Sequence, residues 1–226
     1  MKKTELIQEI REAAIIAIIR GVEHEKLPPL LDALAAGGIR FAEITFDQTG
    51  RTSDGETAQS IAELKKHMAG RMHIGAGTVM TVGQADRAMT AGAEFLISPN
   101  VNPEVIRHTV AAGCVSIPGA MTPTEAEVAY ESGADFVKLF PADTLGLSYI
   151  KALMAPLSHI PFLAVGGVNE RNIGDFLATG LAGVGVGSAL TPIEWIANEC
   201  YQQITELANR YCNVVQNHRN CFGKRA

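Results

Sequence analysis

The chain has 226 residues, of which 47% are hydrophobic and 19% charged, the balance of an ordinary globular protein with a large core. Its net charge of −5 excludes the broad basic field of a nucleic-acid-binding protein, and no apolar run is long enough to span a bilayer. This length suits one α/β barrel, so we expect a single domain over residues 1–226.

The two ends of the chain have different patterns. A helical pattern with acidic residues occupies about residues 3–14 and is unlike a signal peptide, whereas a frayed tail is expected over about 217–226. The four cysteines show no paired short spacing and are interpreted as the reduced thiols of a cytoplasmic protein. They are Cys114, Cys200, Cys212 and Cys221.

Short apolar runs recur along the chain, and each predicts a buried β-strand. Most follow a helical pattern that ends in glycine, which favours the left-handed turn at a helix C-terminus. The predicted strands are residues 15–20, 40–46, 73–78, 94–98, 114–117, 135–140, 161–165 and 183–187.

Helix starts follow many of these strands. Capping boxes, in which a threonine precedes Gln or Glu by three residues, begin at Thr81, Thr122 and Thr191, and Asn102 precedes a proline. Eight strands that alternate with helices predict a (β/α)8 TIM barrel. An open doubly wound sheet is the alternative, although its glycine fingerprint after the first strand is missing.

Residues 47–56 form an unusually long polar connection after the second predicted strand. In a barrel this segment would lie over the catalytic face, because it follows the carboxyl end of a strand. It is either a lid or an ordinary surface loop.

The sixth predicted strand is apolar on both faces except for one lysine. Alternation places Lys138 on the same face as Phe136 and Phe140, opposite Val137 and Leu139. Burial disfavours an ammonium ion, so a lowered pKa would leave free amine that can form a Schiff base with a ketone. The alternative is an edge-strand lysine that discourages aggregation.

Other polar residues fall at the ends of the predicted strands, where barrels carry their functional groups. Glu43, with Thr45 on the same face, is either a proton-transfer group or half of a buried structural ion pair. Arg20 and Thr78 can hold a carboxylate.

The last two predicted strands end in small residues that leave backbone N–H groups accessible before helix starts. This arrangement predicts a phosphate site at Gly166, Gly167, Gly187 and Ser188. The six histidines form no metal-ligand pattern, so neither a metal nor another cofactor is predicted.

A set of motifs in chain order resembles the class I 2-keto-3-deoxy-6-phosphogluconate (KDPG) and 4-hydroxy-2-oxoglutarate (KHG) aldolases. The motifs are Glu43-Ile44-Thr45, Gly75-Ala76-Gly77-Thr78-Val79, Ile97-Ser98-Pro99-Asn100, Ile117-Pro118-Gly119, Phe136-Val137-Lys138-Leu139-Phe140-Pro141 and Gly166-Gly167-Val168. The resemblance implies that Lys138 is the Schiff-base lysine and Glu43 the general acid/base.

The same resemblance implies roles for the remaining residues. Thr78, Pro99, Thr45 and Pro118 would surround the pyruvate end together with Arg20, and the glycines and Ser188 would bind the distal phosphate. The family resemblance further implies a homotrimer that needs no metal and whose partner is a small-molecule substrate, with neither nucleic acid nor membrane.

Two positions depart from the KDPG pattern. Asp47 stands where many KDPG enzymes carry an arginine, while Arg20 with Val165 resembles the phosphogalactonate branch. The expected reaction is cleavage of a 2-keto-3-deoxy-6-phosphosugar acid to pyruvate and glyceraldehyde 3-phosphate. The alternatives are a 4-hydroxy-2-oxoglutarate aldolase, a phosphosugar epimerase or isomerase, and a non-catalytic phosphometabolite-binding barrel.

Overall fold

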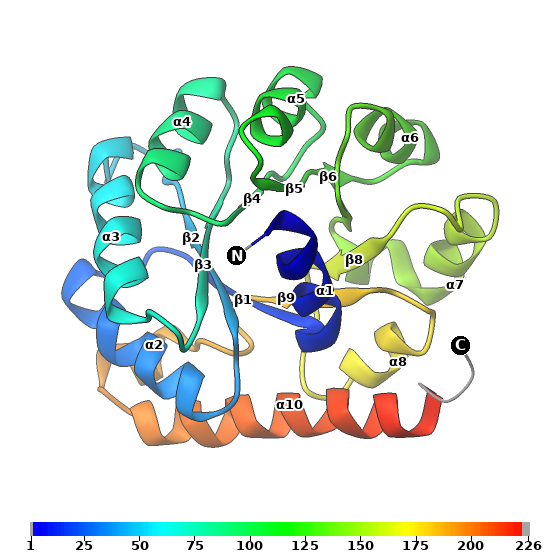
Figure 1. Cartoon of the computed structure of the whole chain (residues 1–226). Helices are drawn as coiled ribbons and strands as arrows, with labels where there is room; N and C mark the ends of the chain where they lie inside the picture. Colours follow the sequence, from blue (N-terminus) through cyan, green and yellow to red (C-terminus); the bar gives the residue numbers. More distant parts are fainter. Residues whose placement is uncertain (1, 223–226) are drawn as a thin grey trace.

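A computed structural model describes residues 2–222 as a parallel β-barrel surrounded by helices (Figure 1). All strands pair in parallel in the order β5-β4-β3-β2-β1-β9-β8-β7-β6, which confirms the predicted TIM barrel. The strands are β1 (Ile15–Ile19), β2 (Phe41–Thr45), β3 (His73–Gly77), β4 (Phe95–Ile97), β5 (Val115–Ile117), β6 (Gly119–Ala120), β7 (Val137–Leu139), β8 (Phe162–Val165) and β9 (Gly183–Val186).

The barrel closes through the segment around Pro118. Proline has no N–H to donate, and two short strands lie on either side of it. The first, β5, corresponds to the fifth predicted strand and pairs with β4, whereas β6, which was not predicted, pairs with β7. The Pro118 carbonyl still accepts a hydrogen bond from the Lys138 amide at 2.8 Å. This one segment therefore joins both sides of the sheet.

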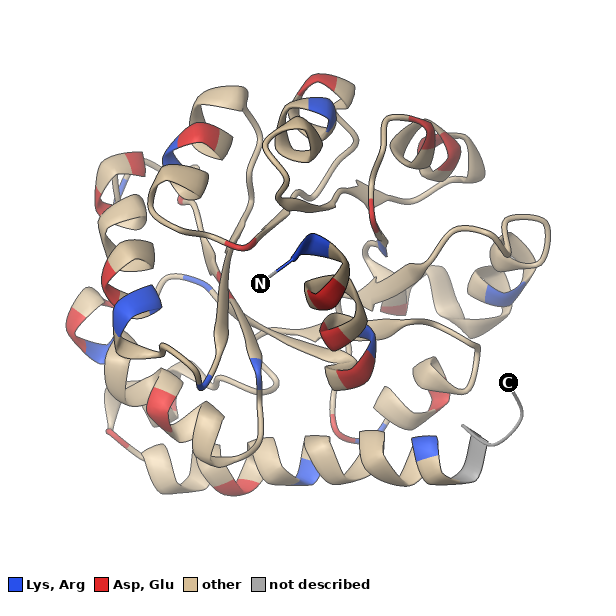
Figure 2. Cartoon of the chain, in the orientation of Figure 1, with Lys and Arg blue, Asp and Glu red and all other residues tan. Residues whose placement is uncertain are grey.

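All helices except α1 form an outer ring around the strands, and most of the charged residues lie on the helices (Figure 2). The helices are α1 (Lys3–Ala13), α2 (Leu27–Ala36), α3 (Asp54–His67), α4 (Val82–Thr90), α5 (Pro103–Ala111), α6 (Pro123–Glu131), α7 (Ala142–Met154), α8 (Ile173–Leu177), α9 (Ile193–Ala197) and α10 (Tyr201–Phe222), with a short 3-10 turn η1 (His24–Lys26) before α2.

The apolar core has an outer and an inner part. The outer part fills the space between the strands and the ring of helices, and the inner part contains Ile16, Phe41 and Phe136 from the strands. Leu6 and Ile10 of α1 pack against this inner part, and α1 lies across the barrel opening in Figure 1. Apolar packing therefore closes the interior of the barrel at its amino end.

Several predicted helix starts are confirmed. Thr122 and Glu125 form a reciprocal capping box, the Thr81 hydroxyl accepts the Gln84 amide, and the Asn102 side chain accepts the Glu104 amide. These bonds satisfy amide groups that have no partner within the first helical turn.

The capping box predicted at Thr191 is wrong. Helix α9 begins at Ile193 after an N-cap proline that has no side-chain hydrogen bond. The buried Thr191 hydroxyl instead donates to the Gly187 carbonyl at 3.2 Å. The residue thus closes the turn after β9, which removes it from the helix start.

The expected tail is also corrected. Helix α10 continues to Phe222, so residues 217–222 are helical, and 223–226 lie outside the described residues. Ile204, Ala208 and Tyr211 are buried along its first half, and near its end the Arg219 guanidinium donates to the Arg11 carbonyl. The helix lies beside α2 and α8, as Figure 1 shows.

Within residues 2–222, no helix has both the length and the apolarity that a membrane crossing requires. The cysteine side chains described there, Cys114, Cys200 and Cys212, are free thiols.

Candidate active site

A cavity of about 640 Å³ opens at the carboxyl ends of the strands. It lies where a TIM barrel carries its catalytic groups. Eight of the residues predicted from sequence line it, namely Arg20, Thr78, Pro99, Lys138, Gly166, Gly167, Gly187 and Ser188.

The cavity has room for a ligand because β9 contributes almost no side chains to it. A Cβ on Gly185 would lie 2.9 Å from Val165 Cγ2 and 3.1 Å from Ile18 Cδ1, closer than ordinary packing allows. Gly185 and Gly187 both line the cavity. Glycine in this strand thus provides space inside the barrel.

Lys138 on β7 is the buried amine of the site, with only 5% of its surface exposed. Its neighbours Val137 and Leu139 pack in the outer core and Phe136 in the inner core, as the predicted alternation requires. The Lys138 Nζ lies 4.8 Å from the centre of the Phe140 ring. Burial lowers the pKa of Lys138, the Arg20 charge lowers it further, and Glu43 opposes both effects.

Glu43 is a carboxylic acid buried within the barrel wall, 1% exposed. Its strand, β2, is four places from β7 in one direction around the barrel and five in the other, so Glu43 and Lys138 belong to opposite sides of the barrel. Burial raises the pKa of Glu43, against the opposing charges of Lys138 and Arg20.

Two observations distinguish the possible roles of Glu43. Its Oε2 atom has no hydrogen-bond partner, and within residues 2–222 it forms no direct ion pair. A carboxyl group that serves only structure would be expected to have its lone pairs satisfied. Gly77 makes room for it, because a Cβ there would lie 2.3 Å from Glu43 Oε1.

Arg20 and Thr78 form one polar unit at the cavity wall. The Arg20 guanidinium donates to the Thr78 hydroxyl at 3.0 Å. Thr78 has φ 58°, a left-handed conformation that is rare and strained for a β-branched residue. The strain coincides with a side chain that faces a ligand cavity, which is where such conformations tend to occur.

The loop at Gly166 and Gly167, predicted to bind phosphate, has a backbone conformation that favours glycine. Gly166 and Gly167 have φ values of 96° and 70°, and a Cβ on Gly167 would lie 2.2 Å from the Asp143 Cγ atom. The Asn169 and Asn172 side-chain amides donate to the Gly167 carbonyl at 3.1 and 2.9 Å. The loop is therefore held in a conformation that only glycine accepts at these positions.

The cavity differs from the sequence-based prediction in part of its wall. Thr45, Pro118 and Glu43 are not among the residues that line it. Asn169, Phe140 and Ile18 line it but were not predicted. A polar residue two positions after the Gly-Gly turn was the available signal for Asn169, whereas nothing in the local pattern distinguishes the apolar pair.

Asp47 organises its own loop. Its carboxylate accepts hydrogen bonds from the backbone amides of Thr49, Arg51 and Thr52 at 2.9, 2.7 and 3.1 Å. These bonds, with that of Thr49 the largest cause, lower the pKa of Asp47 to about 2. Because its oxygens are already occupied, Asp47 does not take the place of a substrate-binding arginine.

The described residues contain no group of three or more His, Cys, Asp or Glu side chains that could hold a metal ion.

Comparisons with known proteins point to one family. The family model described as KDPG and KHG aldolase matches residues 6–207. The chain is 35% identical to the 2-dehydro-3-deoxy-phosphogluconate aldolase of Treponema pallidum, over 93% of this chain and 97% of that protein. It is 34% identical to the 2-dehydro-3-deoxy-6-phosphogalactonate aldolase of Escherichia coli, over 89% of this chain and 96% of the relative.

A solved structure shares the same fold. The KDPG aldolase of Legionella pneumophila, with pyruvate captured as a covalent carbinolamine intermediate, superposes with a TM-score of 0.81. It is 31% identical, over 92% of this chain and 97% of that one.

Proposed function

This chain belongs to the KDPG and KHG aldolase family, and from that premise we propose how its own residues perform the reaction. It is a lyase of the aldolase type that cleaves a 2-keto-3-deoxy-6-phosphosugar acid. The products we expect are pyruvate and glyceraldehyde 3-phosphate. Relatives named for both the gluconate and the galactonate substrates match it at similar identity, so both epimers are candidates.

Lys138 is the proposed nucleophile. Its Nζ attacks the C2 carbonyl carbon of the substrate to give a carbinolamine, which loses water to give an iminium ion. The lowered pKa of Lys138 supports this role, because only the free amine has a lone pair for the attack. The burial that lowers the pKa also keeps bulk water from the adduct.

Glu43 is the proposed proton-transfer group. It accepts the C4 hydroxyl proton, directly or through a water molecule, while the C3–C4 bond breaks and the electrons of that bond move into the iminium ion, giving an enamine and the free aldehyde. The enamine is then protonated at C3 and hydrolysed from Lys138. The free lone pairs of the Glu43 carboxyl group and its raised pKa suit a group that both takes and returns a proton.

The rest of the cavity is proposed to orient the substrate. Arg20, fixed by its bond to Thr78, would hold the carboxylate next to the ketone, with Pro99 beside it. Thr45 and Pro118 are proposed to support the pyruvate end from behind the wall. Gly166, Gly167, Gly187 and Ser188 would bind the phosphate through backbone N–H groups and the Ser188 hydroxyl.

Three coarser predictions accompany this mechanism. We propose that residues 1–226 form a single catalytic domain, that the protein assembles as a homotrimer, and that it acts in the cytoplasm without a cofactor. The trimer rests on the family resemblance, and the free thiols of Cys114, Cys200 and Cys212 suit a reducing compartment.

The observation that carries the proposal is the single amine buried at the cavity, Lys138, with an unpartnered buried carboxyl group across the barrel. Sodium borohydride added with pyruvate should reduce the imine and attach one pyruvyl group, which peptide mass mapping should place on Lys138. Lys138→Ala should remove both labelling and turnover while leaving the thermal unfolding curve intact.

Lys151→Ala is the matched control, because this lysine is exposed on α7. It should label and turn over as the parent protein does. Labelling at Lys151, or turnover in Lys138→Ala, would show that the proposed nucleophile is wrong.

A further inference from the structure

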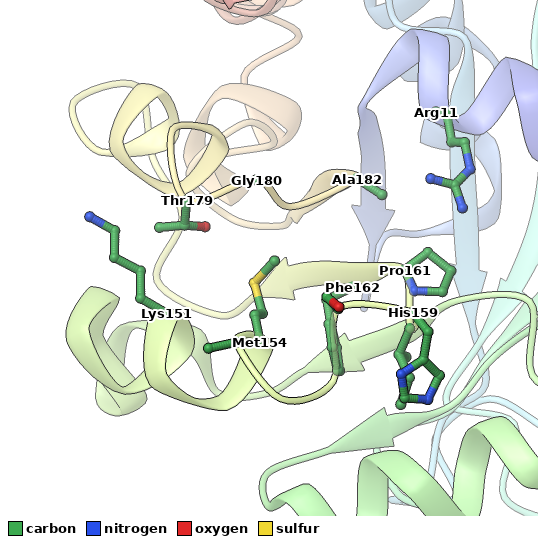
Figure 3. A pocket seen from close by; sticks show the side chains of 12 residues that line it. Arg11, Lys151, Met154, His159, Pro161, Phe162, Thr179, Gly180 and Ala182 are labelled. Carbon is green, nitrogen blue, oxygen red and sulfur yellow. The ribbon is translucent and has the colours of Figure 1, made fainter. Parts of the chain in front are cut away.

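A second cavity, of about 450 Å³, lies at the opposite end of the barrel from the candidate active site. It is bounded by the last turn of α7, the start of β8 and the loop that leads from α8 into β9. In Figure 3 the side chains of Arg11, Lys151, His159, Met154 and Phe162 surround it. Because α1 and the inner core separate the two ends of the barrel, this cavity is distinct from the catalytic one.

The charges around this second cavity have one sign. Three basic side chains line it, and none of the residues that line it in the described chain is acidic. His159 has a partner, Glu127, whose carboxylate lies 3.8 Å from its Nε2 atom. Arg11 and Lys151 have no ion pair and their side chains donate no hydrogen bond within residues 2–222. A chain with net charge −5 thus places two uncompensated cations around one cavity.

Arg11 is held in place by contacts that leave its donors free. Its guanidinium carbon lies over the Phe136 ring, 5.3 Å from the ring centre, and its backbone carbonyl accepts a hydrogen bond from Arg219. A cation–π contact uses none of the guanidinium N–H donors in a hydrogen bond, so they remain available for a planar anion. An ordered arginine also loses less conformational entropy when it binds.

The arrangement of the cavity indicates the kind of ligand. Figure 3 shows Arg11 and Lys151 on opposite sides, with the apolar side chains of Met154 and Phe162 between them. We propose that this cavity binds a small organic dianion with an apolar middle, such as a short aliphatic dicarboxylate. One carboxylate would pair with the Arg11 guanidinium. The other would pair with the Lys151 ammonium, whose side chain points away from Arg11 in Figure 3 and would turn inward, while the methylene groups cover Met154 and Phe162.

Isothermal titration calorimetry with glutarate as the probe tests this proposal, with neutral glutaramide as the uncharged comparison. The full-length protein should bind glutarate and not glutaramide. Arg11→Gln and Lys151→Gln should each weaken glutarate binding about tenfold or more, because each removes a charge-assisted contact. Arg107→Gln and Lys66→Gln remove the same charges from exposed helix positions outside both cavities and should leave binding unchanged.

Arg20→Gln distinguishes this cavity from the catalytic one, which also attracts carboxylates. The affinity for glutarate should survive that substitution. Loss of binding in Arg20→Gln with retention in Arg11→Gln would assign the ligand to the active site and overturn the proposal. Equal affinities in Arg11→Gln and Arg107→Gln, or no binding to the parent protein at about 10 mM glutarate, would also overturn it.

Discussion

At the scale of single residues, the chemistry depends on two buried ionisable groups, Lys138 and Glu43. Burial makes the charged form of each costly, and the charge of the other group offsets part of that cost. Burial favours the neutral amine of Lys138 and the neutral acid of Glu43, while their mutual attraction favours both charges. Arg20 breaks this symmetry, because its fixed charge favours an ionised Glu43 and a neutral Lys138. That combination is what a nucleophilic amine beside a general base requires.

This balance predicts that Glu43→Gln and Arg20→Gln shift the pKa of Lys138 in opposite directions. The rate of pyruvate trapping by borohydride should rise with pH as Lys138 loses its proton, with an inflection below the ordinary lysine pKa of 10.5. Glu43→Gln removes the charge that raises the pKa of Lys138, so its inflection should move to lower pH. Arg20→Gln removes a charge that lowers the pKa, so its inflection should move to higher pH.

Intact-protein mass spectrometry at saturating pyruvate measures these trapping rates. Glu43→Gln should still be trapped although its turnover falls about 10²- to 10⁴-fold, the usual contribution of a general acid or base. If both variants moved the inflection in the same direction, the electrostatic account of Lys138 would be wrong.

Asp47 provides a second residue-scale prediction. Its folded-state pKa of about 2 lies below its ordinary value of 3.8, so its loop bonds persist above pH 3.8 and are lost as the pH falls toward about 2. Asp47→Ala should therefore loosen residues 47–53 at neutral pH and speed tryptic cleavage after the exposed Arg51 several-fold.

The same digest contains its control. Cleavage after Arg107, which lies within α5, should be unaffected by Asp47→Ala. Activity on the phosphosugar acid should change little, because the Asp47 oxygens are bound to the loop. An unchanged rate after Arg51 would mean that the loop is ordered by other contacts.

At the scale of elements, local pattern was sufficient for the strands and for most helix starts. The eight predicted runs all contain observed strands, because a buried parallel strand is apolar over its whole length. Positive φ values at Gly38, Gly92 and Gly133 confirm the left-handed turns expected after helices.

Two kinds of interaction explain the misses. The short strand β6 depends on pairing with β7, which a two-residue pattern after Pro118 does not reveal. The continuation of α10 likewise accompanies its packing against α2 and α8. Thr191 matches a capping box in sequence, but its hydroxyl closes the local turn at Gly187 instead.

Strand β3 carries an element-scale prediction, because two of its glycines face different neighbours. A Cβ at Gly77 would displace the Glu43 carboxyl group, whereas a Cβ at Gly75 would meet the Phe95 ring at 2.3 Å. Gly77→Ala should lower kcat about 100-fold or more while borohydride trapping persists. Gly75→Ala should mainly lower the free energy of unfolding, by about 1–3 kcal/mol, through overpacking.

Urea unfolding and steady-state kinetics of the two variants separate these effects. Gly77→Ala should lose more activity than stability, and Gly75→Ala should lose more stability than activity. A similar ratio of activity loss to stability loss in both would mean that Gly77 serves packing alone and does not position Glu43.

At the scale of the whole molecule, the barrel separates stability from chemistry along its axis. The amino end is filled by the inner core and α1, so it needs no contribution from the residues of the cavity. Strand β8 runs from Phe162, which lines the second cavity, to Val165, which lines the catalytic one. A packed layer lies between the two cavities. The fold therefore tolerates, at the catalytic end, the glycines of β9, the strained backbone of Thr78 and the unpartnered carboxyl group of Glu43.

The final prediction concerns the substrate class that this arrangement selects. A Cβ at Gly187 would have only the Ile18 Cβ within 4 Å, at 3.8 Å, and Gly187 does not have a positive φ. Gly187→Val should therefore fold, and its side chain should enter the cavity where the phosphate is proposed to lie. We expect KM for the phosphorylated keto acid to rise about tenfold or more, with a smaller fall in kcat, because phosphate contacts also orient the substrate.

Unphosphorylated 4-hydroxy-2-oxoglutarate is the internal control for this variant. It shares the reacting atoms but does not reach the proposed phosphate loop, so its KM should change little. Steady-state kinetics on both substrates, with the thermal unfolding midpoint of the same preparation, separates lost binding from lost fold. Equal losses on the two substrates would place the added side chain against the reacting end and would favour a small unphosphorylated keto acid as the substrate.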